Sequence, residues 1–173
     1  MKQLLAGVAV LALASATASV AALAQGSATA TATFISKAGK EAGTAKLTGT
    51  DKGVLIEIEV SGLPAGKWVA FHVHETGSCE YAGGHMSAGG HFNPGKAEHG
   101  YNSPKGPHAG DMPNQYVGAD GILRAQVFNP MVRLDGGDTA IRGRALMIHG
   151  GADDYVSQPA GNAGDRQACG IIK

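Results

Sequence analysis

The sequence has few aromatic residues and no excess of either charge. Aromatic residues make up 5% and charged residues 16% of the 173 positions, and the formal net charge is zero. Because no lysine- or arginine-rich run occurs, neither nucleic acid nor an anionic membrane surface is favoured as a partner. Glycine, by contrast, is abundant with 27 residues, which suits tight turns and shaped loops better than a helical bundle. The length is that of one ordinary domain.

The first 24 residues are typical of a secretory signal peptide. Lys2 precedes an apolar run of Ala, Val and Leu, and Ala22 and Ala24 provide the small residues of a cleavage site. We predict a signal peptide over residues 1–24 and one mature domain over residues 25–173. The mature protein would be periplasmic or otherwise secreted, with no membrane contact after cleavage. A retained membrane anchor is the alternative, which the Ser and Thr residues within the apolar run disfavour.

Cysteine is scarce, with only Cys79 and Cys169 present. An even number of cysteines in an exported chain favours a disulfide over two free thiols. The alternative is a pair of metal ligands, which the separation of the two residues and the abundance of histidine elsewhere disfavour.

The mature chain has the pattern of an all-β protein. Alternating or apolar segments predict strands over residues 28–35, 53–61, 67–75, 122–128 and 142–149. In the clearest segment, 53–61, Val and Ile alternate with Glu. No capped amphipathic helix of ordinary length is found, so short strands joined by Gly/Pro turns indicate a sandwich or barrel. Two long segments, 76–121 and 150–169, are expected to be functional loops or disordered.

Histidines occur at positions that could converge on metal ions. His72 and His74 alternate within a predicted strand, so their side chains share one face about 7 Å apart. Their apolar neighbours are expected to face the core, which leaves both histidines, and similarly His149, pointing outward. The long loop adds a possible tetrahedral zinc set of three imidazoles and a carboxylate, or else ordinary loop residues: His91, His99, His108 and Asp111.

Several motifs together resemble the copper/zinc superoxide dismutase family. They are Phe-His-Val-His-Glu (71–75), Gly-Gly-His-Phe-Asn-Pro (89–94), His-Gly (99–100), His-Ala-Gly-Asp-Met-Pro-Asn (108–114), Met-Ile-His (147–149) and Gly-Asn-Ala-Gly-Asp-Arg-Gln-Ala-Cys-Gly (161–170). The resemblance covers nearly the whole mature chain, with the ligand positions in order and at the family's spacing. It implies an all-β fold: an eight-stranded antiparallel Greek-key β-barrel or sandwich with long metal-binding and active-site loops.

The resemblance also implies the role of each site residue. A copper ion would be held by His72, His74, His91 and His149, and a zinc ion by His91, His99, His108 and Asp111. His91 would bridge the two metals and take part in catalysis. Arg166 would be the catalytic arginine beside the open copper position, Asp153 would join a copper histidine to a zinc histidine from outside the ligand sets, and Cys79 would pair with Cys169 as the family's disulfide.

The implied reaction converts two superoxide anions and two protons into oxygen and hydrogen peroxide. Imidazole ligands suit both oxidation states of copper, and zinc has no redox role. The runner-up is an exported copper/zinc buffering protein without significant turnover, which would need the ligands but not Arg166. The long Cys79–His91 interval and the short segment 150–165 resemble the bacterial exported branch of the family, in which the choice between a monomer and a homodimer stays open.

Three residues fall outside the family pattern. His85 matches no ligand position, and we expect it to be a solvated loop histidine rather than an accessory metal contact. Lys96 or Lys105 could guide the anionic substrate, since the longer loop's usual charged residues have no clear counterparts here.

Overall fold

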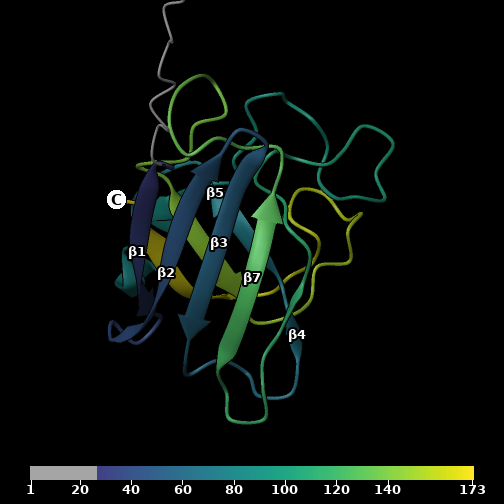
Figure 1. The fold of residues 1–173 in the computed structure, drawn as a ribbon. Coiled ribbons are helices and arrows are strands. Elements are labelled where there is room, and N and C mark those ends of the chain that lie inside the picture. The colour runs from purple at the N-terminus through teal and green to yellow at the C-terminus, as the bar shows by residue number, and fades with distance from the viewer. Residues whose placement is uncertain (1–26) are drawn as a thin grey trace, which may run out of the picture.

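The structure is a computed structural model that describes residues 27–173, and the predicted signal peptide therefore lies outside the described residues (Figure 1). Nine β-strands and two short 3₁₀ turns are present among these residues. Within this range no helix is long and apolar enough to cross a bilayer. The antiparallel all-β prediction is confirmed.

One end of the main sheet contains four long strands. β1 (Thr29–Ser36), β2 (Glu41–Thr50), β3 (Gly53–Val60) and β7 (Leu123–Asn129) pair in that order, each antiparallel to its neighbour. The alternation predicted for β3 is confirmed, because Val54, Ile56, Ile58 and Val60 are all buried.

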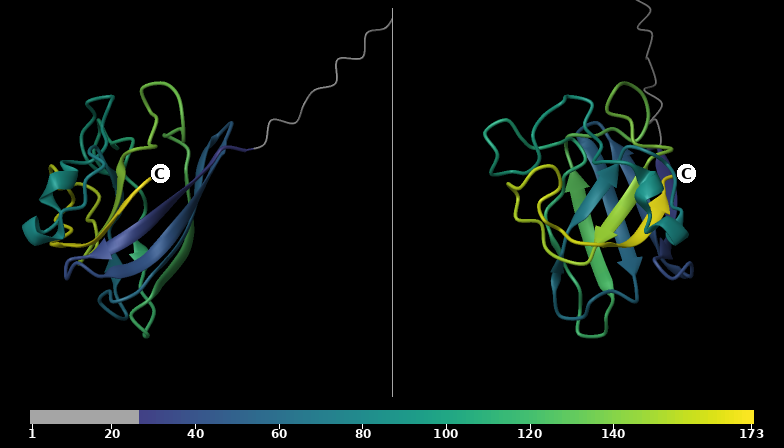
Figure 2. Two further views of the ribbon diagram at one scale, coloured as in Figure 1. Left: turned by 90° about the vertical axis from the view of Figure 1, so that its left-hand side faces the viewer. Right: turned by 180° about the vertical axis from the view of Figure 1, so that it is seen from behind.

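The other end continues past β1. β9 (Arg166–Ile171) pairs with β1, β8 (Ala145–His149) pairs with β9, and β5 (Phe71–His74) forms the edge, which gives the order β5-β8-β9-β1-β2-β3-β7. The last strand thus returns to lie beside the first, as in a Greek key. In Figure 2 the β8 and β9 end lies across the β2, β3 and β7 end, and apolar side chains from both ends form one core.

A pair of two-residue strands lies between the two edges of the main sheet. β4 (Trp68–Val69) pairs with β6 (Gln115–Tyr116). β4 and β5 together correspond to the predicted strand 67–75, interrupted at Ala70. A bridge between Val117 and Leu123 connects the segment after β6 to β7. Counting β4 and β5 as one interrupted strand gives the eight strands of the predicted barrel.

Two loops cover the outer face of β5 and β8. The first follows β5 and contains the turns η1 (Tyr81–Gly83) and η2 (Met86–Ala88), and the second connects β8 to β9. In Figure 2 both loops lie on the side of the molecule away from β2 and β3. They therefore enclose whatever side chains β5 and β8 direct outward.

Candidate metal centre

Histidines from β5 and β8 lie between the sheet and the covering loops. The alternation within β5 sends Phe71 and Val73 into the core and His72 and His74 to the opposite side. That side is not solvent, since His72 is 0%, His74 is 1% and His149 is 4% exposed. The expectation of outward histidines is therefore correct with respect to the apolar core, and wrong if outward is taken to mean solvated, because the loops cover them.

Four histidines form the copper-side set. Their ligand atoms lie within 4.8 Å of one another in the group His72, His74, His91 and His149. The ring nitrogens that converge are buried and have no hydrogen-bond partner among the described residues: His72 Nδ1, His74 Nε2, His91 Nε2 and His149 Nε2. Buried polar atoms in proteins are nearly always paired. Four unpaired nitrogens that lie this close together fit a bound copper ion, for which imidazole is a suitable ligand.

The opposite ring nitrogens of the strand histidines are held by hydrogen bonds. His74 Nδ1 donates to the Gly89 carbonyl at 3.0 Å, and His149 Nδ1 donates to the Gly164 carbonyl at 3.3 Å. A hydrogen placed on Nδ1 leaves the Nε2 lone pair free for a metal. The protein thereby selects the tautomer that copper requires.

The zinc-side set contains three histidines and one carboxylate. The ligand atoms of His91, His99, His108 and Asp111 also lie within 4.8 Å of one another, and all four residues are buried. Asp111 Oδ1 is 2.8 Å from His91 Nδ1, and Asp111 Oδ2 is 3.1 Å from His99 Nδ1. Three imidazole nitrogens and one carboxylate oxygen are typical ligands of tetrahedral zinc.

His91 belongs to both sets through different atoms. Its Nδ1 faces Asp111 on the zinc side, and its Nε2 is the unpaired atom on the copper side. The ring centroid of His91 is 4.0 Å from that of His72 and 5.0 Å from that of His99. One imidazole ring is thus placed to bridge the two metals.

Asp153 connects the two sets from outside. Its Oδ2 accepts from His72 Nε2 at 2.8 Å, and its Oδ1 accepts from His99 Nε2 at 3.0 Å. Hydrogens on these Nε2 atoms leave both Nδ1 atoms free for metal. The carboxylate therefore orients one ring of each set, which is the geometry implied by the family resemblance.

The electrostatics of the copper side favour neutral imidazoles. Burial, together with the charges of neighbouring histidines, lowers the pKa of His149 to about 3 and that of His91 to about 4. Burial likewise holds the pKa of His74 well below its ordinary value. Neutral imidazole is the form that binds metal, so these rings are prepared for a metal near neutral pH.

On the zinc side the carboxylate is charged. Burial alone would raise the pKa of Asp111, but contacts with the three zinc-side histidines and the Gly100 N–H hold that pKa well below its usual range. The anionic oxygens also accept from the backbone N–H groups of Gly100 and His108, each at 3.0 Å. The site thus supplies one negative charge for a divalent cation.

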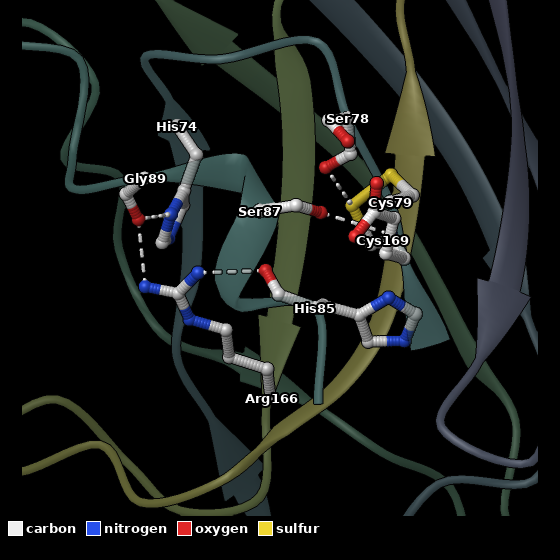
Figure 3. Close-up of a disulfide and its surroundings, with 9 residues drawn as sticks. His74, Ser78, Cys79, His85, Ser87, Gly89, Arg166 and Cys169 are labelled. Atoms are coloured by element: carbon white, nitrogen blue, oxygen red, sulfur yellow. Dashed lines mark hydrogen bonds between the residues drawn. A yellow bond between two sulfur atoms is a disulfide. The ribbon is translucent and has the colours of Figure 1, made fainter. Parts of the chain in front are cut away.

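Arg166 lies near the copper side, at the start of β9. Its guanidinium donates to the His85 carbonyl at 2.8 Å through Nη1 and to the Gly89 carbonyl at 2.7 Å through Nη2 (Figure 3). The Gly89 carbonyl also accepts from His74, so a single oxygen contacts both the arginine and a copper-side ligand. Arg166 also lines a surface hollow of about 430 Å³ together with Lys37.

Cys79 and Cys169 form a disulfide, with Cα atoms 5.6 Å apart (Figure 3). It joins the loop after β5 to β9, close in sequence to Arg166. The metal-ligand alternative for the two cysteines is excluded by this bond.

Three sequence expectations concern residues beyond the ligand sets. His85 is not solvated: it is 0% exposed, and its ring lies on the side of the disulfide, away from the Arg166 guanidinium (Figure 3). Lys105 lies 4.0 Å from Glu98. Neither Lys105 nor Lys96 lines the hollow beside Arg166, where Lys37 is found instead. Sequence reasoning missed Lys37 because it lies in the β1–β2 turn, far from the metal-binding motifs along the chain.

The fold and these sites together define a class: a β-barrel protein that binds copper and zinc at one buried, histidine-bridged centre. The sequence model described as copper/zinc superoxide dismutase matches residues 41–172. The chain therefore belongs to the copper/zinc superoxide dismutase family, and it has both of the family's metal sites intact.

Individual relatives agree with this assignment. The chain is 50% identical over 143 residues to superoxide dismutase [Cu-Zn] 1 of Aquifex aeolicus, with 80% of this chain and 84% of the relative covered. The copper/zinc superoxide dismutase of Brucella abortus superposes with a TM-score of 0.70 at 30% identity, over 84% of this chain and 100% of that one. A superoxide dismutase-like protein of Bacillus subtilis gives a TM-score of 0.77 at 39% identity, over 81% and 95% of the two chains.

Proposed function

We propose that this protein dismutes superoxide outside the cytoplasm. In this proposal Arg166 binds the superoxide anion, and His91, the histidine shared by the two metal sites, takes up and releases a proton. The observation that supports the proposal is the pair of complete, buried ligand sets joined through His91. Relatives include proteins named as dismutases and one named only dismutase-like, so likeness alone would not separate an enzyme from a metal-binding protein.

The metals would be held by the two sets described above. When bound, copper supplies one-electron redox chemistry by alternating between Cu(II) and Cu(I), while zinc has no redox role. The overall reaction consumes two superoxide anions and two protons and releases oxygen and hydrogen peroxide. Binding of the anion, transfer of the proton and orientation of the metal ligands depend on the side chains of the protein.

Arg166 provides the anion-binding group. A guanidinium has fixed donors and a permanent charge, and two donors of Arg166 are used by the carbonyls of His85 and Gly89. The remaining donors can contact a small anion. Lys37 lines the same hollow and adds a second positive charge there, beside the carboxylate of Asp165.

His91 transfers a proton, and Asp153 orients two of the metal ligands. His91 Nε2 has no protein partner, so it is the atom that can take up and release a proton while Nδ1 stays on the zinc side. Asp153 accepts from His72 and His99 and thereby keeps both rings in the tautomer that binds metal.

Export is part of the proposal. Residues 1–24 have the pattern of a secretory signal peptide. The disulfide is typical of proteins in oxidising compartments. Relatives 40–50% identical in sequence include the superoxide dismutases of the bacteria Aquifex aeolicus and Caulobacter vibrioides. We infer that the mature protein, residues 25–173, is periplasmic or secreted.

The test is stopped-flow superoxide decay by the mature protein loaded with both metals. Rapid decay is expected for the parent. The rate of superoxide decay should be roughly 10- to 100-fold lower in Arg166→Ala, which corresponds to the loss of one charge-assisted contact of about 1.5–3 kcal/mol. Arg124→Ala is the matched control, because Arg124 pairs with Asp120 and Glu59 at the exposed edge of the sheet. A fully loaded parent no faster than its metal-free form would refute dismutation and favour metal buffering.

A further inference from the structure

His85 is a buried histidine that belongs to neither ligand set. It is 0% exposed, and neither ring nitrogen has a hydrogen-bond partner among the described residues. Burial lowers the pKa of His85 and the charge of Arg166 lowers it further, while the backbone of Cys79 and Ser36 acts in the opposite direction. The ring is therefore neutral near pH 7, and its place is determined by packing.

The backbone of His85 has a left-handed conformation, and its carbonyl contacts Arg166. His85 has φ 60° and ψ 19°, in the left-handed region, as the residue preceding the turn η2. Its N–H donates to the Glu80 carbonyl at 3.0 Å. Its carbonyl accepts from Arg166 Nη1 at 2.8 Å. A side chain that is held firmly thus sits on a backbone unit that contacts the anion-binding arginine.

The residues at the two ends of η2 both bind the guanidinium of Arg166. His85 precedes the turn and Gly89 follows it, and each supplies one carbonyl to Arg166 (Figure 3). At the Gly89 end the same carbonyl contacts His74, and Ala88 packs in a small apolar cluster around the disulfide. At the other end the ring of His85 points away from the guanidinium, toward the side on which the disulfide lies.

We propose that His85 is the positioning residue for Arg166: its buried ring anchors the first end of η2, and its carbonyl thereby fixes the guanidinium for the anion. This inference rests on the anion-binding role proposed for Arg166. Neither ring nitrogen makes a well-aligned hydrogen bond, but the backbone of Cys79 and of Ser36 lies close enough to act on the ring, so the anchor is the buried ring as a whole.

Two variants separate the ring from the backbone. His85→Gly removes the ring and accepts the left-handed conformation, and His85→Asn removes the ring while keeping a residue that tolerates this conformation. Tyr81→Ala is the matched control, because the Tyr81 side chain in the neighbouring turn η1 is 51% exposed and does not line the hollow beside Arg166. Each protein is loaded with copper and zinc, and its metal content and melting temperature are measured.

The main readout is the affinity of the Cu(II)-loaded protein for azide, a small anion, measured by visible absorption, alongside superoxide decay. Both His85 variants should bind azide roughly 10-fold more weakly and lose a similar factor in rate, as expected when a positioned charge is released. Tyr81→Ala should match the parent. In an Arg166→Ala background the His85 substitutions should cause almost no further loss, because residues that act through one another are not additive.

Several outcomes would overturn the inference. Azide affinity that equals the parent's while only the melting temperature falls would show a purely structural role, and so would losses that add fully to those of Arg166→Ala. A loss in His85→Gly alone, without one in His85→Asn, would assign the effect to backbone flexibility. If Arg166→Ala itself behaves like the parent, the proposed role of Arg166 fails and this inference fails with it. An impaired Arg166→Ala beside parent-like His85 variants rejects the inference alone.

Discussion

Replacing Asp153 with asparagine should weaken copper binding more than zinc binding. The carboxylate, whose side chain is 1% exposed, accepts a hydrogen bond from one ring of each metal site. An amide of the same shape has only one accepting oxygen, and its NH₂ group can only donate. One of the two contacts must therefore be lost.

The surroundings of the carboxylate decide which contact is lost. Oδ1 accepts both His99 Nε2 at 3.0 Å and the Tyr155 N–H at 2.6 Å, whereas Oδ2 accepts only His72 Nε2, at 2.8 Å. The amide oxygen is best placed at the Oδ1 position, where it serves two donors. The NH₂ group then faces the N–H of His72, which must rotate or shift its hydrogen to Nδ1, the copper-facing atom.

The size of the effect follows from this loss. Groups that orient metal ligands typically contribute 10- to 100-fold in affinity, equivalent to about 1.4–2.7 kcal/mol. We expect the affinity of Asp153→Asn for copper to fall by about 10- to 100-fold and its affinity for zinc to fall less. The assay is competition of each metal against a chelator of known affinity, followed by the visible absorption of Cu(II) and by metal analysis for zinc.

Asp154→Asn is the control, because the Asp154 carboxylate is exposed and bonds only within its own loop, to Val156, Ser157 and Asn162. Its metal affinities should equal those of the parent. The reasoning is refuted if Asp153→Asn loses zinc while keeping copper, or if both affinities are unchanged.

Three further results are expected. Replacing Cys79 and Cys169 with serine opens a loop of 90 residues, and the free energy of unfolding measured in urea should fall by about 4–5 kcal/mol; an unchanged value would contradict the loop-entropy estimate. Gly161→Ala should lower zinc affinity, since its Cβ would collide with the carboxylate linking the two sites, whereas Gly164→Ala, also at positive φ but with nothing nearer than 3.9 Å, should not; equal effects in a chelator titration would indicate backbone strain alone. His85 stays neutral when folded but gains a proton below its ordinary pKa of 6.5 when unfolded, so stability falls as pH drops below about 6.5, by at most about 1.4 kcal/mol per pH unit. His85→Asn should show a shallower decline in urea unfolding between pH 7 and 5, and an identical slope would refute this.

Local alternation was sufficient to predict part of the fold. β3 has Val and Ile on one face and Glu on the other, and the structure buries the first set as expected. β2 was not identified, because its Thr, Gly and Ala residues give little alternation and only Ala45 and Leu47 are buried. Pairing on both sides, with β1 and β3, overrides that weak local signal.

The ligand sets were predictable from the sequence only as a pattern. Strand periodicity places His72 and His74 on one face, but nothing local shows that loop residues such as His99 meet them. The family resemblance supplied that connection. The sequence could not reveal burial by the loops, so His85, in a polar glycine-rich segment, was wrongly expected to be solvated. Its surroundings include the backbone of Ser36 at the end of β1, which lies far from it along the chain.

The most direct test of the central claim, that the two metal sites share the ring of His91, is electron paramagnetic resonance with Cu(II) at the copper side and Co(II) in the place of zinc. A single imidazole joining both ions through Nδ1 and Nε2 couples their unpaired electrons. We predict that stoichiometric Co(II) strongly diminishes the Cu(II) signal and that Zn(II) in the same position leaves it intact. A Cu(II) signal unchanged by bound Co(II) would contradict the shared-histidine centre.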